Sequence, residues 1–271
     1  MAFFFLSFSR WLNFLSFDVV LIALAWQEVF ARTATITLRW EERTLLAISI
    51  WMVYITDHWL DGIIDLGSTV AFFVNKAPRH YYVRSHRLLL GVLFIIALLA
   101  NVGLLWRLGL RLLIAGSILA LISLVYLVLN HFFLRRKQWL KGREIIISII
   151  FSVGCALVPL VQSHQPWLLL PWVVAFTAIA LINCTLIARM ERQVSIFELA
   201  PRWILSLQWM LGFCFIIIII SFFSPDMIRA LCWSFMGLGF IPMIARRFGC
   251  EIASLAADQV LFFAALFALI R

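Results

Sequence analysis

Charged residues are scarce in this sequence. Only 13% of its 271 residues are Asp, Glu, Lys or Arg, about half of the roughly 25% that is usual in soluble domains. Hydrophobic residues make up 65% of the chain, and its mean hydropathy is +1.05. Long polar stretches are also missing, whereas apolar runs of about 20 residues, the length that crosses a bilayer, recur from end to end. This composition excludes a water-soluble domain and predicts a polytopic membrane protein.

The sequence also lacks the alternating pattern of barrel strands and any clustered cysteine spacing. Its apolar runs are long and continuous, which excludes membrane-spanning β-strands and leaves helices, because every backbone group in a bilayer must be satisfied within the protein. The five cysteines are scattered without a CxxC pair, so neither a zinc site nor a disulfide framework is indicated. The predicted class is an all-α membrane protein.

The apolar runs predict nine transmembrane helices. These cover residues 16–31, 44–60, 88–106, 112–133, 145–161, 167–188, 203–223, 227–245 and 252–270. The economical description of these helices is one membrane-embedded domain over residues 1–271.

The positive charges gather on alternate connections. The segments 76–87, 135–143, 189–202 and 246–247 follow the second, fourth, sixth and eighth expected helices. With Arg10, that side of the membrane holds fifteen of the 22 lysine and arginine residues. Since basic loops stay in the cytoplasm, we expect the N-terminus inside and the C-terminus outside. The net charge of +9 then indicates an anionic lipid surface as partner, and no nucleic acid.

Three carboxylates recur at one end of the second expected helix. Asp57, Asp61 and Asp65 are four residues apart, so they drift only about 80° around a helix and share one face. Carboxylates this close repel one another unless a cation lies between them, and Mg²⁺ bridges such oxygens to phosphate groups. The pattern predicts a metal site; the alternative is a solvated helix end.

Basic residues follow these carboxylates. Four of them lie in one connection: Lys76, Arg79, Arg84 and Arg87. Such side chains bind phosphate groups, although an ordinary positive loop on the cytoplasmic side is the alternative. Lys141, before the fifth expected helix, is a further phosphate candidate, or else pairs only with Glu144.

The sixth expected helix ends in a second polar group. Asn183 and Glu191 are eight residues apart and so share a face, with Arg189 beside them. We expect Asn183 to face the protein interior, since an amide facing lipid is costly. Glu191 is a candidate fourth oxygen ligand for the metal; alternatively it pairs with Arg189 or Arg192.

Three more acidic residues stand inside expected helices: Asp18, Glu28 and Asp258. Their roles are open, and a transporter that uses them is one alternative function. Transport would be favoured by helices broken at matching positions of two halves, and the prolines show no such symmetry.

The segment D-H-W-L-D-G-I-I-D resembles the first acidic motif, N-D-x-x-D-x-x-x-D, of the UbiA-type intramembrane prenyltransferases. Asp61 and Asp65 match the last two acids of that motif. Asp57 stands where the family has Asn, and His58 stands where it has the first Asp. This puts part of the metal set in doubt, because His does not replace a carboxylate at a Mg²⁺ site.

The second motif of that family, D-x-x-x-D, lies over I-A-R-M-E. Glu191 matches its second acid, and Ile187 replaces its first. The segment K-G-R-E-I-I-I-S also looks like the opening of the family's fifth helix. The family has nine helices, as expected here, although the motif match covers only about 40 residues.

The resemblance implies a fold with a central cavity and an enzyme that uses Mg²⁺. Such enzymes ionise a prenyl diphosphate and transfer the prenyl group to a lipophilic, often aromatic, acceptor. Metal binding would then fall to Asp57, Asp61, Asp65 and Glu191. Diphosphate would be bound by Lys76, Arg79, Arg84, Arg87, Lys141 and Arg189, with Asn183 also at the substrate.

The same resemblance leaves two alternatives open. A membrane terpene cyclase would share the ionisation step and capture the carbocation internally. A non-catalytic binding or scaffold protein would keep the fold, as the altered second motif allows. In each case we expect an integral protein of the bacterial inner (cytoplasmic) membrane, with its site on the cytoplasmic side.

Overall fold

The computed structural model describes residues 16–64, 86–130, 142–191 and 226–270. Within these ranges the regular elements are eight α-helices and a short 3-10 helix, with no strand. The prediction of an all-α protein is therefore confirmed for the described part of the chain.

Six helical segments are long and apolar enough to cross a membrane: Leu88–Arg107, Leu110–Val128, Arg143–Gln162, Pro166–Ala188, Asp226–Phe248 and Ile252–Leu269. Their length matches the roughly 20 residues that span a bilayer. The prediction of a membrane protein is supported by these six segments. Two further helices are not among these six segments: the shorter α2 (Phe17–Thr33) and the acid-bearing α3 (Trp40–Ile64).

Eight of the nine predicted helices have a counterpart in the described residues, and the one predicted over 203–223 lies outside them. Among the helix starts, the largest difference is at α3, which begins at Trp40 instead of residue 44. Glu42 explains the earlier start, because its Oε2 accepts the backbone N–H of Arg39 at 2.8 Å. A glutamate in the third helical position that reaches back to the preceding N–H caps the helix.

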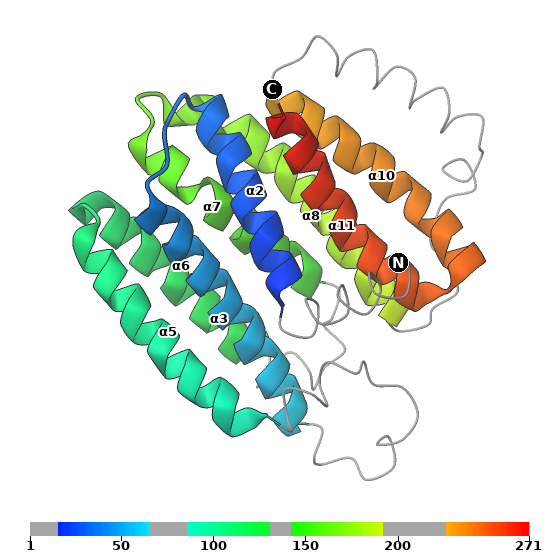
Figure 1. The fold of residues 1–271 in the computed structure, drawn as a ribbon, viewed down its shortest axis with the longest axis horizontal. Coiled ribbons are helices and arrows are strands. Elements are labelled where there is room, and N and C mark those ends of the chain that lie inside the picture. The colour runs from blue at the N-terminus through cyan, green and yellow to red at the C-terminus, as the bar shows by residue number, and fades with distance from the viewer. Residues whose placement is uncertain (1–15, 65–85, 131–141, 192–225, 271) are drawn as a thin grey trace. The chain divides into compact units, whose positions relative to one another are not determined.

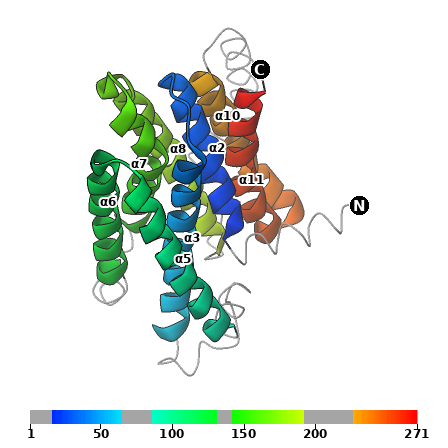
Figure 2. The same cartoon turned by 60° about the vertical axis from the view of Figure 1, so that its left-hand side comes forward.

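The described chain forms two compact units. The first unit comprises residues within 1–24 and 38–150, and its main helices are α3, α5 (Arg87–Arg107) and α6 (Leu110–Val128). In this unit α5 packs against both α3 and α6, as Figures 1 and 2 show. Asn101 on α5 donates from Nδ2 to Oγ of Ser49 on α3 at 2.9 Å. Most of α5 is exposed and apolar, as expected of a helix facing lipid.

The second unit comprises residues within 25–37 and 151–271. It contains α8 (Leu170–Glu191), α10 (Asp226–Phe248) and α11 (Cys250–Leu269), and these three helices pack on one another. Helices α10 and α11 are antiparallel neighbours joined at Gly249 (Figure 1). The φ angle of Gly249 is 92°, a conformation that favours glycine.

Aromatic side chains form the core of the second unit. Trp26 stacks on Phe176 with ring centroids 3.9 Å apart, and Phe30 and Phe151 also contact Phe176. Trp26 and Phe176 are fully buried. The indole N–H of Trp26 donates to the carbonyl of Leu261 at 3.2 Å, which satisfies its polar group inside the core.

Both α2 and α7 (Arg143–Gln162) contribute residues to the two units. The prediction that residues 1–271 form a single domain concerns how these units join, and it stays a prediction.

Candidate functional site

The described part of the predicted acidic site contains an ion pair. Asp57 lies near the end of α3, and Oδ2 of its carboxylate is 2.8 Å from Nη2 of Arg143. Both residues belong to the first unit. The side chain of Asp57 is 11% exposed and that of Arg143 is 27% exposed, so water only partly screens the pair.

The position of Arg143 explains why it needs an acid. It is the first residue of α7, and the N-terminus of a helix carries partial positive charge that disfavours a cation. The carboxylate of Asp57 offsets both this partial charge and the guanidinium. The acidic end of α3 therefore lies next to the start of α7, whose preceding residues are basic.

The other predicted metal ligands are described less fully. Asp61 follows Asp57 on the same continuous helix, one turn later, and Glu191 is the last residue of α8; their side chains lie outside the described residues, as does the whole of Asp65. Among the side chains that are described, no group of three or more His, Cys, Asp or Glu could hold a metal ion. The Mg²⁺ site stays a prediction.

Most predicted phosphate ligands also lie outside the described part of the chain. Lys76, Arg79, Arg84 and Lys141 do so entirely. Arg87 and Arg189 lie on described helices, α5 and α8, while the positions of their side chains are outside what is described. Arg143 was absent from the predicted set, although it belongs to the same basic connection as Lys141.

The expectation that Asn183 faces the interior is confirmed. Its residue is 5% exposed, and its Nδ2 donates to Oδ1 of Asp258 on α11 at 2.9 Å. The acid and amide both lie in segments able to span a membrane. Asp258, whose role the sequence left open, therefore joins α8 to α11 within the second unit.

Asp18 has a local explanation. It lies in the first turn of α2, and its Oδ1 accepts the backbone N–H of Val19 at 2.9 Å. An acid at a helix N-terminus is favourable, so Asp18 gives no support to a path for transported ions.

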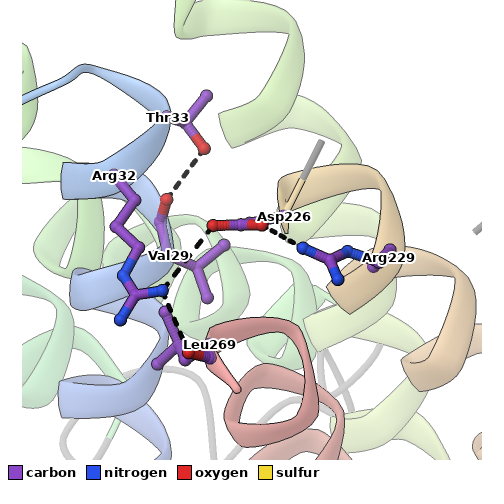
Figure 3. A network of polar contacts seen from close by, with 6 residues as sticks. All are labelled: Val29, Arg32, Thr33, Asp226, Arg229 and Leu269. Carbon is purple, nitrogen blue, oxygen red and sulfur yellow. Dashed lines mark hydrogen bonds and ion pairs between the residues drawn. The ribbon is translucent and has the colours of Figure 1, made fainter. Parts of the chain in front are cut away.

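A third polar cluster joins three helix ends of the second unit (Figure 3). Arg32, in the last turn of α2, donates from Nη1 to the carbonyl of Leu269 at the end of α11, at 3.0 Å. The same Nη1 lies 3.9 Å from Oδ2 of Asp226, the first residue of α10. Asp226 also pairs with Arg229, one turn along α10. Arg32 and Arg229 are among the seven lysine and arginine residues outside Arg10 and the four basic segments, and sequence reasoning did not predict that they share an acid.

Comparisons of the chain with models of protein families, with curated proteins and with solved structures found no match. The functional argument therefore depends on the residues themselves.

Proposed function

We propose that this membrane protein is a Mg²⁺-dependent prenyltransferase of the UbiA type. It transfers a prenyl group from a prenyl diphosphate to a lipophilic acceptor of the aromatic class. In this proposal nine helices surround a central cavity in the bacterial cytoplasmic membrane, with the N-terminus and the site on the cytoplasmic side.

The observation that carries the proposal is the contact between Asp57 and Arg143. A site for a metal diphosphate needs carboxylates for the cation and basic groups for the phosphate oxygens. The ion pair brings the helix that bears Asp57 and Asp61 to Arg143, which follows Lys141 in the sequence. The carboxylate of Asp57 suits Mg²⁺ as an oxygen donor.

In the proposed reaction the C–O bond between the prenyl group and the diphosphate breaks, and the diphosphate leaves with the electron pair. The allylic carbocation then bonds to the acceptor, which loses a proton. Asp57, Asp61, Asp65 and Glu191 would hold Mg²⁺, which when bound neutralises charge on the leaving group. Lys76, Arg79, Arg84, Arg87, Lys141 and Arg189 would bind diphosphate oxygens, and stabilising charge where it develops is what lowers the barrier.

The test measures diphosphate release from farnesyl and geranylgeranyl diphosphate by the purified full-length protein, with Mg²⁺ and with a chelator. Release should require Mg²⁺. Asp61→Asn and Asp65→Asn should each lower it by about 10²-fold or more, a usual loss when a group that stabilises developing charge is removed.

Glu41→Gln provides a matched control, because Glu41 is a carboxylate at the opposite end of the same helix α3. This variant should keep the wild-type rate. Full activity of Asp61→Asn and Asp65→Asn would contradict the metal site. Absence of both release and prenyl-diphosphate binding would contradict the enzyme and favour a scaffold protein.

A further inference from the structure

The cluster of Arg32, Asp226, Arg229 and the Leu269 carbonyl plays no part in the proposed reaction. It lies at one end of the second unit, where α2 ends, α10 begins and α11 ends. Asp226 is the first residue of one segment able to span a membrane, and Leu269 is the last residue of another. Where such segments begin and end, hydrocarbon gives way to lipid headgroups.

The cluster carries an excess of positive charge. Two guanidinium groups share the single carboxylate of Asp226, so the three side chains together are cationic. Partial positive charge from the N-terminus of α10, where Asp226 and Arg229 stand, adds to this excess. The C-terminus of α11 carries partial negative charge, and Arg32 already offsets it by donating a hydrogen bond to the Leu269 carbonyl at 3.0 Å.

Arg229 has hydrogen-bonding capacity that the described protein does not use. Its residue is 7% exposed, and its Nε is buried without a hydrogen-bond partner in the structure. Leaving a buried donor unsatisfied is costly, and more so on a charged group. The arrangement therefore favours a further acceptor beside Arg229.

Arg32 provides the exposed side of the cluster. Its side chain is 40% exposed, whereas that of Arg229 is 9% exposed. The contacts described above engage only its Nη1, so the guanidinium has further N–H groups that could donate hydrogen bonds. Guanidinium groups bind phosphate through paired N–H donors.

We propose that Arg32 and Arg229 form a binding site for the phosphate group of an anionic phospholipid. A phosphodiester has one negative charge and acceptor oxygens, which match the excess charge and the unused donors of the cluster. A lipid is favoured over soluble phosphate because the cluster lies at the ends of membrane-spanning segments. Basic pockets between transmembrane helices bind lipid headgroups on the cytoplasmic side, and the same chemistry applies to this cluster, which the predicted topology places on the outer side. The site is independent of the prenyltransferase proposal.

The experiment titrates the detergent-purified full-length protein with short-chain phosphatidylglycerol and follows its thermal stability. Parallel titrations use short-chain phosphatidylcholine and inorganic phosphate. Wild-type protein should be stabilised most by phosphatidylglycerol. Arg229→Gln should weaken the apparent affinity by roughly tenfold or more, as expected for loss of a hydrogen bond to a charged group.

Two further variants keep the test decisive. Arg32→Gln changes an exposed residue and should weaken the affinity while the protein stays folded. Asp226→Asn removes the carboxylate that competes with the lipid phosphate, and it should tighten phosphatidylglycerol binding. If the cluster only joins helices, Arg229→Gln, Arg32→Gln and Asp226→Asn should all lower the stability without changing the lipid affinity.

Arg107→Gln is the matched control, because Arg107 is an exposed arginine at the end of another membrane-spanning helix, α5. It should leave the affinity unchanged. Unaltered affinity in Arg229→Gln and Arg32→Gln, or an equal loss in Arg107→Gln, would overturn the site. Equal stabilisation by inorganic phosphate would overturn the lipid as its occupant.

Discussion

Nη2 of Arg143 lies 2.8 Å from Oδ2 of Asp57, which joins the start of α7 to the acidic end of α3. Asp57 therefore has two possible functions. Asp57 holds Arg143 in a partly buried ion pair, and in the proposed reaction it also supplies an oxygen to Mg²⁺. Exchanging the two charges separates these functions.

The exchange variant combines Asp57→Arg with Arg143→Asp. Either single change places two like charges next to each other in a partly buried position, and we expect it to destabilise the protein by about 1–3 kcal/mol. The double variant should regain much of that stability, since opposite charges again face each other. Thermal unfolding in detergent measures this effect.

Activity should respond differently from stability in the same variants. If Asp57 is a metal ligand, diphosphate release should stay low in the restored double variant, because an arginine at residue 57 cannot bind Mg²⁺. Recovery of both stability and diphosphate release would show that the pair is only structural.

The close approach of α10 and α11 predicts a steric effect at Gly237. A Cβ atom added there would lie 2.5 Å from Cγ1 of Val260. Gly237→Ala should therefore destabilise the protein by about 1–3 kcal/mol, the usual cost of overpacking. Thermal unfolding in detergent again provides the measurement.

Gly103→Ala serves as the control for that change, because Gly103 is also helical and has no atom within 4 Å of an added Cβ. Its alanine variant should be neutral or stabilised by up to about 1 kcal/mol through helix propensity. Adding Val260→Ala to Gly237→Ala should restore stability. Equal effects at the two glycines would show that α10 and α11 are not in this contact.

The hydrogen bond between Asn183 and Asp258 predicts an energetic coupling between α8 and α11. A double-mutant cycle with Asn183→Leu and Asp258→Leu should give a coupling of about 0.6 kcal/mol, the average for hydrogen bonds between membrane helices, and at most about 1.7 kcal/mol. Unfolding of the purified protein by a denaturing detergent provides the four stabilities. Strict additivity of the two changes would argue against the bond.

The charge distribution predicts the orientation in the membrane. Single cysteines at residues 164 and 247 test it, made as His164→Cys and Arg247→Cys in a variant whose five native cysteines are replaced by serine. Both residues are exposed, and they lie on opposite sides in the predicted topology.

A membrane-impermeant maleimide added to intact cells should label the cysteine at residue 164 and leave the one at 247 unlabelled. After the cells are opened, both should react. Labelling with the opposite pattern would invert the topology and place the acidic end of α3 outside.

Much of the helical structure could be predicted from the sequence, because membrane-spanning helices follow from local composition. The third expected helix, 88–106, agrees with α5 to one residue at each end. Errors occurred where polar residues belong to a helix. The start of α3 was placed too late because Glu41 and Glu42 interrupt the apolar run, although acids are favourable in a first helical turn.

Less of the candidate site could be predicted from the sequence. Asp57 could be selected as one of three regularly spaced acids, and the burial of Asn183 followed from the cost of an amide in lipid. Their partners could not be derived, since Arg143 is 86 residues from Asp57 and Asp258 is 75 residues from Asn183. The sequence contains 22 lysine and arginine residues, and charge alone does not indicate which of them pairs with a given acid.

The sequence by itself determined the class of this protein and most of its helical segments, and it predicts an orientation, because hydropathy and loop charge act locally along the chain. Only the tertiary structure decided which polar groups meet. Arg32 reaches a carbonyl 237 residues away at Leu269 because α2 and α11 end at the same level of the second unit. Such contacts arise from the packing of whole helices, and no local pattern of residues encodes them.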